Sequence, residues 1–307
     1  MRIAILGGGS IARKAYLPLL LTWPSTQVVG LLSRTQKTVD EMMSAWPIAY
    51  GTTDLEALLE RRPEAAFVLT ATPSHFELSR RLLEAGVDVY LEKPATQSSQ
   101  ETRFLADLAK ERQRILMVGF NRRYALLYRQ ARERFAARRI QLCVVEKHRA
   151  TAFHTNLYDN YLDDTIHQID LMRFFCGEGT PVHTSFEMRD GKLVGALSVV
   201  ALEGGGKAVV LTSLMAGAWQ ERVTLHGDGL TVDVDAFREL RVKYTDREEV
   251  YGQDRPARWI PESLERGFTG AIEHFFECVR QRQTPQTDGY DSARTQELLE
   301  AMVACAG

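Results

Sequence analysis

The chain has 307 residues, of which 45% are hydrophobic and 25% charged, and its formal net charge is -2. This composition is that of an average globular protein and excludes a strongly basic nucleic-acid-binding chain. No apolar run approaches the roughly 20 residues that a membrane-spanning helix needs. The length is sufficient for two domains, each with its own core.

We expect a cytoplasmic protein with reduced thiols. Three glycines and the basic pair Arg13 and Lys14 interrupt the N-terminus where a signal peptide would have its apolar core. The cysteines lie far apart, without the C-x-x-C spacing of a zinc site or redox dithiol; they are Cys143, Cys176, Cys278 and Cys305. Isolated thiols of this kind are typical of a reducing compartment.

The first 120 residues alternate short apolar runs with amphipathic stretches. We predict strands at residues 3–6, 28–33, 65–70, 87–91 and 115–118, with helical segments between them. Strands that are apolar throughout and separated by helices are typical of a parallel sheet covered on both faces. Residues 1–121 are therefore predicted to form an α/β domain with a doubly wound parallel sheet.

After about residue 122 the pattern changes. Strands predicted at residues 141–149, 208–215, 222–228 and 230–235 alternate apolar and polar side chains, and the last three follow one another with little helix between them. This arrangement favours a largely antiparallel sheet. Helices are predicted within residues 163–177, 263–282 and 292–306. Residues 122–307 are therefore predicted to form an α+β domain built on a large, open, mainly antiparallel sheet.

A glycine-rich loop follows the first predicted strand. Its sequence, GGGSIA, fits the pattern G-x-G-x-x-A, with Gly7, Gly9 and Ala12 at the small positions. These residues permit a tight turn, close approach of a pyrophosphate and close helix packing. The pattern alone is weak, because a glycine-rich turn also occurs in α/β domains that bind no nucleotide. Its place between a strand and a helix favours a dinucleotide site.

The second predicted strand ends without an acidic residue before Asp40. NAD-binding domains usually place Asp or Glu here to bind the ribose 2'-hydroxyl. Hydroxyl and basic side chains stand there instead, and they suit a 2'-phosphate; they are Ser33, Arg34, Thr35 and Lys37. NADP(H) is therefore favoured, with NAD(H) as the alternative. In the competing interpretation Arg34 and Lys37 only form the solvated start of a helix.

Two further segments carry candidate catalytic groups. Lys93 follows the strand 87–91, at the end of a parallel strand where doubly wound sheets bind ligands, and Pro94 permits a cis bond. Asp163, His167 and Asp170 are spaced to share one stripe of a helix, and a histidine beside a carboxylate suits proton transfer during alcohol oxidation. A surface lysine and an exposed helix face with a chance histidine are the competing interpretations.

Several motifs together resemble the glucose-fructose oxidoreductase, inositol dehydrogenase and MocA (Gfo/Idh/MocA) family. They occur in the family's order over nearly the whole chain and are GGGSIA (7–12), TATPSH (70–75), EKP (92–94), GFNRRY (119–124) and DDTIHQID (163–170). The segments LMVGFNRRYALLY, EKHR and YLDDTIHQID are most similar to the MviM-type, virulence-factor-like oxidoreductase subgroup. The resemblance implies an N-terminal NAD(P)-binding Rossmann domain and a C-terminal domain for substrate binding and oligomerisation.

The resemblance also implies roles for individual residues. His167 would accept the proton, Lys93 would hydrogen-bond the reacting oxygen and share the proton, and Asp163 would bind substrate. Thr165 stands where the family usually has glycine. Positions that face the dinucleotide in relatives correspond to Gly7, Gly9, Ser10, Ile11, Ser33, Arg34, Thr72, Pro73, His75 and Glu92, to which we add Ala12, Thr35 and Lys93.

Candidate substrate contacts are Arg122, Lys147, Arg149, Tyr158 and Tyr161. For the pair Lys147 and Arg149, an exposed sheet face explains the period-two spacing equally well. The remaining histidines show no metal-ligand spacing, so no metal site is predicted.

We predict a dehydrogenase that interconverts a secondary alcohol and a ketone on a sugar, polyol or similar small polar molecule, with NADP(H) preferred. It would assemble as a homodimer or homotetramer through the C-terminal sheet, because an uncovered apolar sheet needs a partner. The alternatives are a regulatory protein that senses dinucleotide without turnover and an NAD(P)-assisted glycoside hydrolase.

Overall fold

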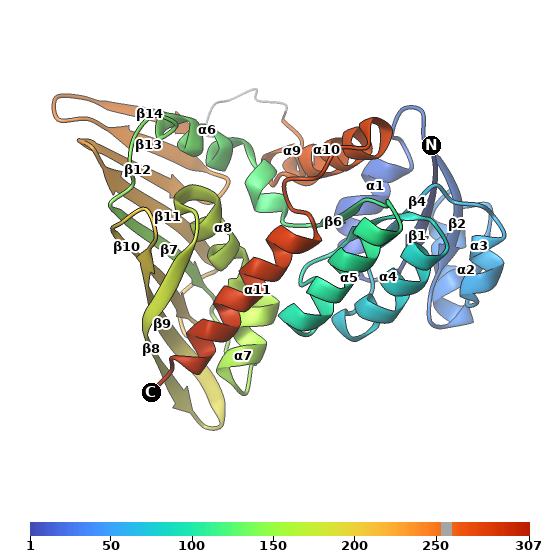
Figure 1. Ribbon diagram of the computed structural model, residues 1–307, viewed down its shortest axis with the longest axis horizontal. Helices are drawn as coiled ribbons and strands as arrows, with labels where there is room; N and C mark the ends of the chain where they lie inside the picture. The colour runs from blue at the N-terminus through green and yellow to red at the C-terminus, as the bar shows by residue number, and fades with distance from the viewer. Residues whose placement is uncertain (253–259) are drawn as a thin grey trace. The chain divides into compact units, whose positions relative to one another are not determined.

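The computed structural model describes residues 1–252 and 260–307, and this part of the chain divides into two compact units (Figure 1). Unit 1 comprises Met1–Phe120 and Phe268–Ala293, and unit 2 comprises Asn121–Gly267 and Arg294–Gly307. No described helix is long and apolar enough to cross a membrane.

Unit 1 is built on a parallel sheet with the strand order β3-β2-β1-β4-β5-β6. This is the order of a doubly wound dinucleotide-binding sheet, so the predicted fold class is confirmed. Every residue of β4 and β5 is buried, in keeping with helices on both faces. The strands are β1 (Arg2–Leu6), β2 (Gln27–Leu32), β3 (Gly51–Thr52), β4 (Ala65–Val68), β5 (Asp88–Leu91) and β6 (Leu116–Val118).

Helices cover both faces of this sheet. On one face, Phe67 of β4 packs against Phe275 and Phe276 of α10, with ring centroids 5.4 and 5.7 Å apart. Helices α4 and α5 pack against each other and against strands of the same sheet. The helices of unit 1 are η1 (Ala12–Tyr16), α1 (Leu17–Leu20), α2 (Gln36–Ala45), α3 (Leu55–Leu59), η2 (Thr72–Ser74), α4 (His75–Glu84), α5 (Ser99–Glu111) and α10 (Phe268–Gln281).

The placement of α10 differs from the predicted continuous second domain of residues 122–307. Apolar contacts with β4 and β5 draw this late segment into unit 1, where Phe275 also lies 5.5 Å from Tyr90 between ring centroids. The predicted helix 263–282 is accordingly divided, because Gly267 has a φ of +81° and ends the short helix α9 (Glu262–Glu265). Sequence periodicity carries no information on such long-range partners.

Unit 2 is built on a sheet whose described strands follow the order β14-β13-β12-β11-β7-β10-β9-β8. Its pairings among the described residues are antiparallel except for β7 with β10, which confirms the predicted, mainly antiparallel sheet. The strands are β7 (Leu142–His148), β8 (Gly179–Arg189), β9 (Lys192–Leu202), β10 (Lys207–Ser213), β11 (Gln220–Gly227), β12 (Leu230–Asp235), β13 (Glu239–Lys243) and β14 (Glu248–Gly252).

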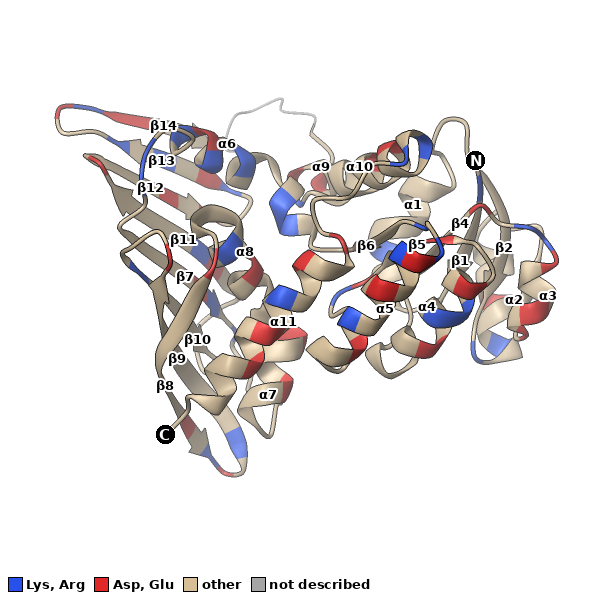
Figure 2. Ribbon diagram, viewed as in Figure 1, with Lys and Arg blue, Asp and Glu red and all other residues tan. Residues whose placement is uncertain are grey.

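The two faces of this sheet differ. Inward side chains on β7, β10 and β11 are buried, and α8 packs against β7 and β10. Strands β12 to β14 carry both acidic and basic residues (Figure 2), and Lys243 Nζ lies 2.6 Å from an Asp233 oxygen. The helices of unit 2 are η3 (Asn121–Tyr124), α6 (Leu126–Arg134), α7 (Leu157–Asn160), η4 (Tyr161–Thr165), α8 (Ile166–Cys176), α9 and, from Arg294, most of α11 (Gly289–Ala304).

Candidate functional site

The glycine loop after β1 has the backbone that a dinucleotide requires. Gly7 has a φ of +108°, and a Cβ there would lie 2.6 Å from the carbonyl oxygen of Leu69. A Cβ on Gly9 would meet nothing within 4 Å, so the space beside this backbone is open. Ala12 is buried, Ile11 is exposed, and Ser10 is the first helical residue after the loop. The loop therefore fits a pyrophosphate against its main chain.

The hydroxyl and basic residues after β2 have different surroundings. Ser33 is buried, and Thr35 caps α2, because its hydroxyl oxygen accepts a hydrogen bond from the Thr38 N–H at 3.3 Å. Arg34 and Lys37 are exposed. Both basic side chains are therefore accessible to a ligand at the end of β2.

The loop after β4 is tied to the segment that carries Lys93. Thr72 and Pro73 lie in η2, and His75 is buried with its Nδ1 2.9 Å from the Pro94 carbonyl oxygen and its Nε2 2.9 Å from that of Thr70. Burial lowers the pKa of His75 despite these carbonyls. The ring therefore joins two loops at the carboxyl ends of β4 and β5.

Lys93 lies directly beyond the carboxyl end of β5, as predicted, and the Lys93–Pro94 bond is cis. Its neighbour Glu92 is buried and accepts hydrogen bonds from the Tyr16 hydroxyl and, at 3.0 Å, from the Lys93 main-chain N–H. Burial and the Glu92 charge raise the pKa of Tyr16 well above its usual range. Tyr16, which sequence reasoning missed, therefore holds the carboxylate beside Lys93.

In unit 2, His167 lies in the first turn of α8 and is 5% exposed. Asp163 precedes it in η4, where its side chain is 62% exposed and lies 3.7 Å from His154 Nε2. Asp170 is fully buried and accepts from Arg123 Nε at 2.9 Å. The predicted stripe therefore does not lie on one continuous α-helix, because Asp163 belongs to the π-helical turn η4, whereas His167 and Asp170 belong to α8.

The predicted substrate cations form ion pairs inside unit 2. Lys147 Nζ lies 2.9 Å from an Asp164 carboxylate oxygen and 3.2 Å from one of Glu221. Arg149 donates to Asp164 at 2.6 Å, and Arg122 donates to Glu221 at 2.8 Å. We call these side chains the buried charge cluster: Arg122, Lys147, Arg149, Asp164 and Glu221.

The acidic members of the buried charge cluster were missed in the sequence. Burial raises the pKa of Glu221, but Arg122 and Lys147 outweigh it and lower the pKa to about 2. Burial likewise opposes ionisation of Asp164, yet Arg149 and Lys147 hold its pKa well below the usual range. A charged residue at an inward strand position, such as Lys147, signals that a buried counter-charge is needed.

The two tyrosines predicted to contact substrate have different environments. Tyr161 is fully buried, and its hydroxyl lies 2.8 Å from the Ser198 hydroxyl on β9. Burial raises the pKa of Tyr161 to about 12. Tyr158 is half-buried in α7. Tyr161 therefore packs α7 and η4 against the sheet.

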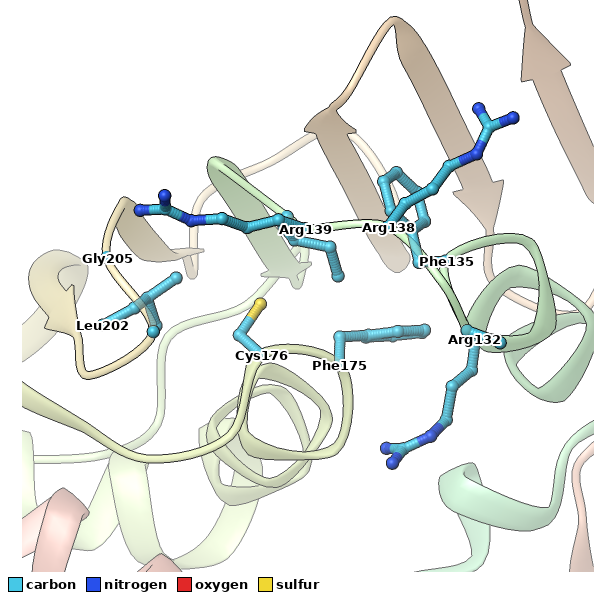
Figure 3. Close-up of a pocket in the computed structure, with 11 residues that line it drawn as sticks. Arg132, Phe135, Arg138, Arg139, Phe175, Cys176, Leu202 and Gly205 are labelled. Atoms are coloured by element: carbon cyan, nitrogen blue, oxygen red, sulfur yellow. The ribbon is translucent and has the colours of Figure 1, made fainter.

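A cavity of about 270 Å³ opens elsewhere in unit 2, between the end of α6, the end of α8 and the β9–β10 turn. Figure 3 shows the Cys176 sulfur pointing into it, whereas the side chains of Arg132, Arg138 and Arg139 diverge. Its described lining residues include none of the predicted site residues. Within the described residues no group of His, Cys, Asp or Glu is arranged to hold a metal ion.

Comparison with known proteins settles the family. The profile described as "Oxidoreductase family, NAD-binding Rossmann fold" (GFO_IDH_MocA) matches residues 1–120. The putative oxidoreductase YceM of Salmonella typhimurium is 32% identical over 311 residues, which cover 98% of this chain and 97% of that protein. The chain belongs to the Gfo/Idh/MocA family. It is therefore an NAD(P)-binding oxidoreductase, and the resemblance predicted from its motifs is confirmed.

Two further proteins match over more than nine-tenths of their length. A solved structure of the dehydrogenase MviM from Clostridium difficile has a TM-score of 0.91 at 24% identity and covers 99% of this chain and 98% of that one. The scyllo-inositol 2-dehydrogenase (NAD(+)) of Bacillus subtilis is 22% identical over 97% of this chain and 92% of that protein. The two-unit fold is therefore shared well beyond the Rossmann sheet.

Proposed function

We propose that this protein is an NADP(H)-preferring dehydrogenase that interconverts a secondary alcohol and a ketone on a sugar or polyol. The observation that carries the proposal is that a member of this family has a lysine directly after β5 and a histidine in the first turn of α8. A polyol dehydrogenase among its full-length relatives supports the substrate class.

Oxidation of a secondary alcohol removes one hydride and one proton, and the nicotinamide, when bound, takes the hydride. We assign the proton to His167 as general base, with Lys93 donating a hydrogen bond to the reacting oxygen. Asp163, whose carboxylate is exposed, binds substrate hydroxyls. In the reverse direction the same groups return the proton to the ketone oxygen.

The dinucleotide would be held by residues of unit 1. The Gly7–Gly9 backbone and the start of η1 would bind the pyrophosphate, and Arg34 would bind the 2'-phosphate. Open space beside Gly9 and the exposed guanidinium of Arg34 support this assignment.

The proposal is tested by incubating the purified protein with NADP+ or NAD+ and a panel of sugars and polyols, and following absorbance at 340 nm. We expect steady reduction with at least one substrate. Dinucleotide binding without turnover across the panel would contradict a dehydrogenase and favour a sensor. Cleavage of glycosides without net reduction would instead identify the cofactor-assisted hydrolase.

Arg34→Ala is expected to weaken binding of NADP+ by roughly 10- to 100-fold, because a charge-assisted phosphate contact is worth about 1.5–3 kcal/mol. Affinity for NAD+ should change little, since it lacks the 2'-phosphate. Calorimetric titration of both dinucleotides measures the change. Lys110→Ala, which removes an exposed charge from α5, serves as the control. Equal losses for NADP+ and NAD+ would refute the role of Arg34.

We further propose that the outward face of the unit 2 sheet forms the interface of a homo-oligomer. Half-exposed apolar side chains on this face continue across β9 and β10, namely Leu197, Val199, Val209 and Leu211. Apolar patches of this kind mark protein contacts.

Val209→Lys is expected to reduce the mass measured by light scattering to that of a monomer. Thr224→Lys, on the polar part of the face, should leave the mass unchanged; an unchanged mass for Val209→Lys would contradict the interface.

A further inference from the structure

The segment before α8 is a π-helical turn in which two consecutive aspartates differ in exposure. Residues Tyr161–Thr165 form a π-helical turn, η4, between α7 and α8. Such turns are rare and widen the helix by one residue, so they change which side chains face the core. Of the consecutive aspartates in η4, Asp163 is 62% exposed at its side chain and Asp164 is 3% exposed.

The buried charge cluster holds Asp164 at both its side chain and its main chain. Lys147 Nζ lies 2.9 Å from the carboxylate and also donates to the Asp164 carbonyl oxygen at 3.1 Å. Arg149 donates to the same carboxylate at 2.6 Å through Nε and forms a second bond through Nη2. These bonds fix the direction of the carboxylate and the position of the backbone in η4.

The lysine itself is held by residues distant in sequence. Lys147 is 3% exposed at its side chain and is paired in register with Glu221 across β7 and β11. Glu221 is fully buried and also binds Arg122. Positive and negative groups therefore alternate from Arg122 through Glu221, Lys147 and Asp164 to Arg149.

A stability role alone is a poor explanation for this arrangement. Replacement of buried ion pairs by apolar residues of similar volume is often neutral or stabilising, because desolvation offsets the attraction between the charges. Buried charges do impose geometry, since each must meet its partner. In this chain the charges meet η4 through Asp164, and η4 ends at Thr165, two residues before His167.

We propose that the buried charge cluster locks the register of η4 so that Asp164 faces the sheet and Asp163 faces outward, where it binds substrate. This inference rests on the proposed function for the role of Asp163. Lys147, Arg149 and Asp164 are positioning residues, which act on substrate through Asp163. Thr165, whose hydroxyl donates to Asn160 Oδ1 at 3.0 Å, supports the same turn.

The test is a double-mutant cycle of Asp163→Asn and Asp164→Asn, read as kcat/KM with the best substrate of the panel. Each single variant is expected to lower kcat/KM at least 10-fold, and the double variant should be little worse than either one. This non-additivity follows because Asp163 is no longer positioned once Asp164 loses its charge. Effects that multiply would overturn the proposal, because a merely structural role for Asp164 would act independently of Asp163.

Hydrogen exchange of the peptide spanning residues 157–167 provides a second measurement that needs no activity. Asp164→Asn should accelerate exchange in η4, whereas Asp163→Asn, the matched control at the neighbouring exposed position, should not. Equal exchange in the two variants would overturn the proposal.

If the wild-type protein turns over no substrate, the proposed function fails, and the exchange comparison still decides whether the buried charge cluster fixes η4. Arg149→Lys, which keeps the charge, should restore part of the protection lost in Arg149→Ala.

Discussion

Replacement of His167 by asparagine is expected to lower kcat for alcohol oxidation by roughly 10²- to 10⁴-fold, the usual contribution of a positioned general base. Asparagine retains a polar group of similar reach but cannot accept a proton at neutral pH. Dinucleotide affinity should remain unchanged, because the residues proposed to bind the dinucleotide lie in unit 1 and His167 lies in unit 2.

The measurement combines steady-state kinetics at 340 nm with fluorescence titration of NADPH. His183→Asn, on the exposed edge strand β8, is the matched control and should retain wild-type kcat. Because His167 is buried in unit 2, thermal unfolding of both variants must also be compared. A His167→Asn variant that is folded and keeps its kcat would rule out His167 as the base.

Local chemistry explains why much of the Rossmann sheet could be predicted from the sequence. β1, β2, β4, β5 and β6 each contain a short apolar run, and a buried parallel strand needs no other signal. β3 escaped prediction because Gly51–Thr52 is too short to show a pattern. β8 was missed for a different reason: most of its side chains are exposed, and polar residues outnumber the apolar ones in its sequence.

Two parts of the candidate site could be predicted from local sequence. Gly7 needs a positive φ and has no room for a Cβ, so its position follows from the glycine pattern. Lys93 follows an apolar run, which places it at the end of a parallel strand. Ion pairs could not be located in this way. Arg122 and Glu221 are 99 positions apart in the chain, and Arg123 and Asp170 are 47 apart.

The π-helical turn is the part of this segment that the sequence pattern could not predict. A regular helix places positions i, i+4 and i+7 on one stripe, and the prediction assumed this geometry from Asp163 onward. η4 interrupts this regularity, and its Asp164 forms ion pairs with Lys147 and Arg149 from a separate strand and its extension. Helical periodicity therefore predicted the helix but could not predict its phase.

Loss of the Glu221 charge is expected to destabilise the fold strongly. Arg122 and Lys147 overcome the opposing effect of burial and bring the pKa of Glu221 to about 2. A carboxyl with a folded-state pKa below its unfolded value contributes stability above the unfolded pKa, near 4.3. That contribution, roughly 3 kcal/mol, is lost as the pH falls from about 4.5 to 2.

Glu221→Gln should therefore lower the free energy of unfolding by about 3–5 kcal/mol at pH 7, because Lys147 and Arg122 lose the charge they share. The difference from the wild-type protein should shrink as the pH falls toward 2, since the wild-type carboxyl is then protonated as well. Urea unfolding at pH 7, 4 and 3 measures both effects. Glu187→Gln, on the exposed edge strand β8, should show neither. A gap that is independent of pH would mean that shape, and not charge, makes Glu221 necessary.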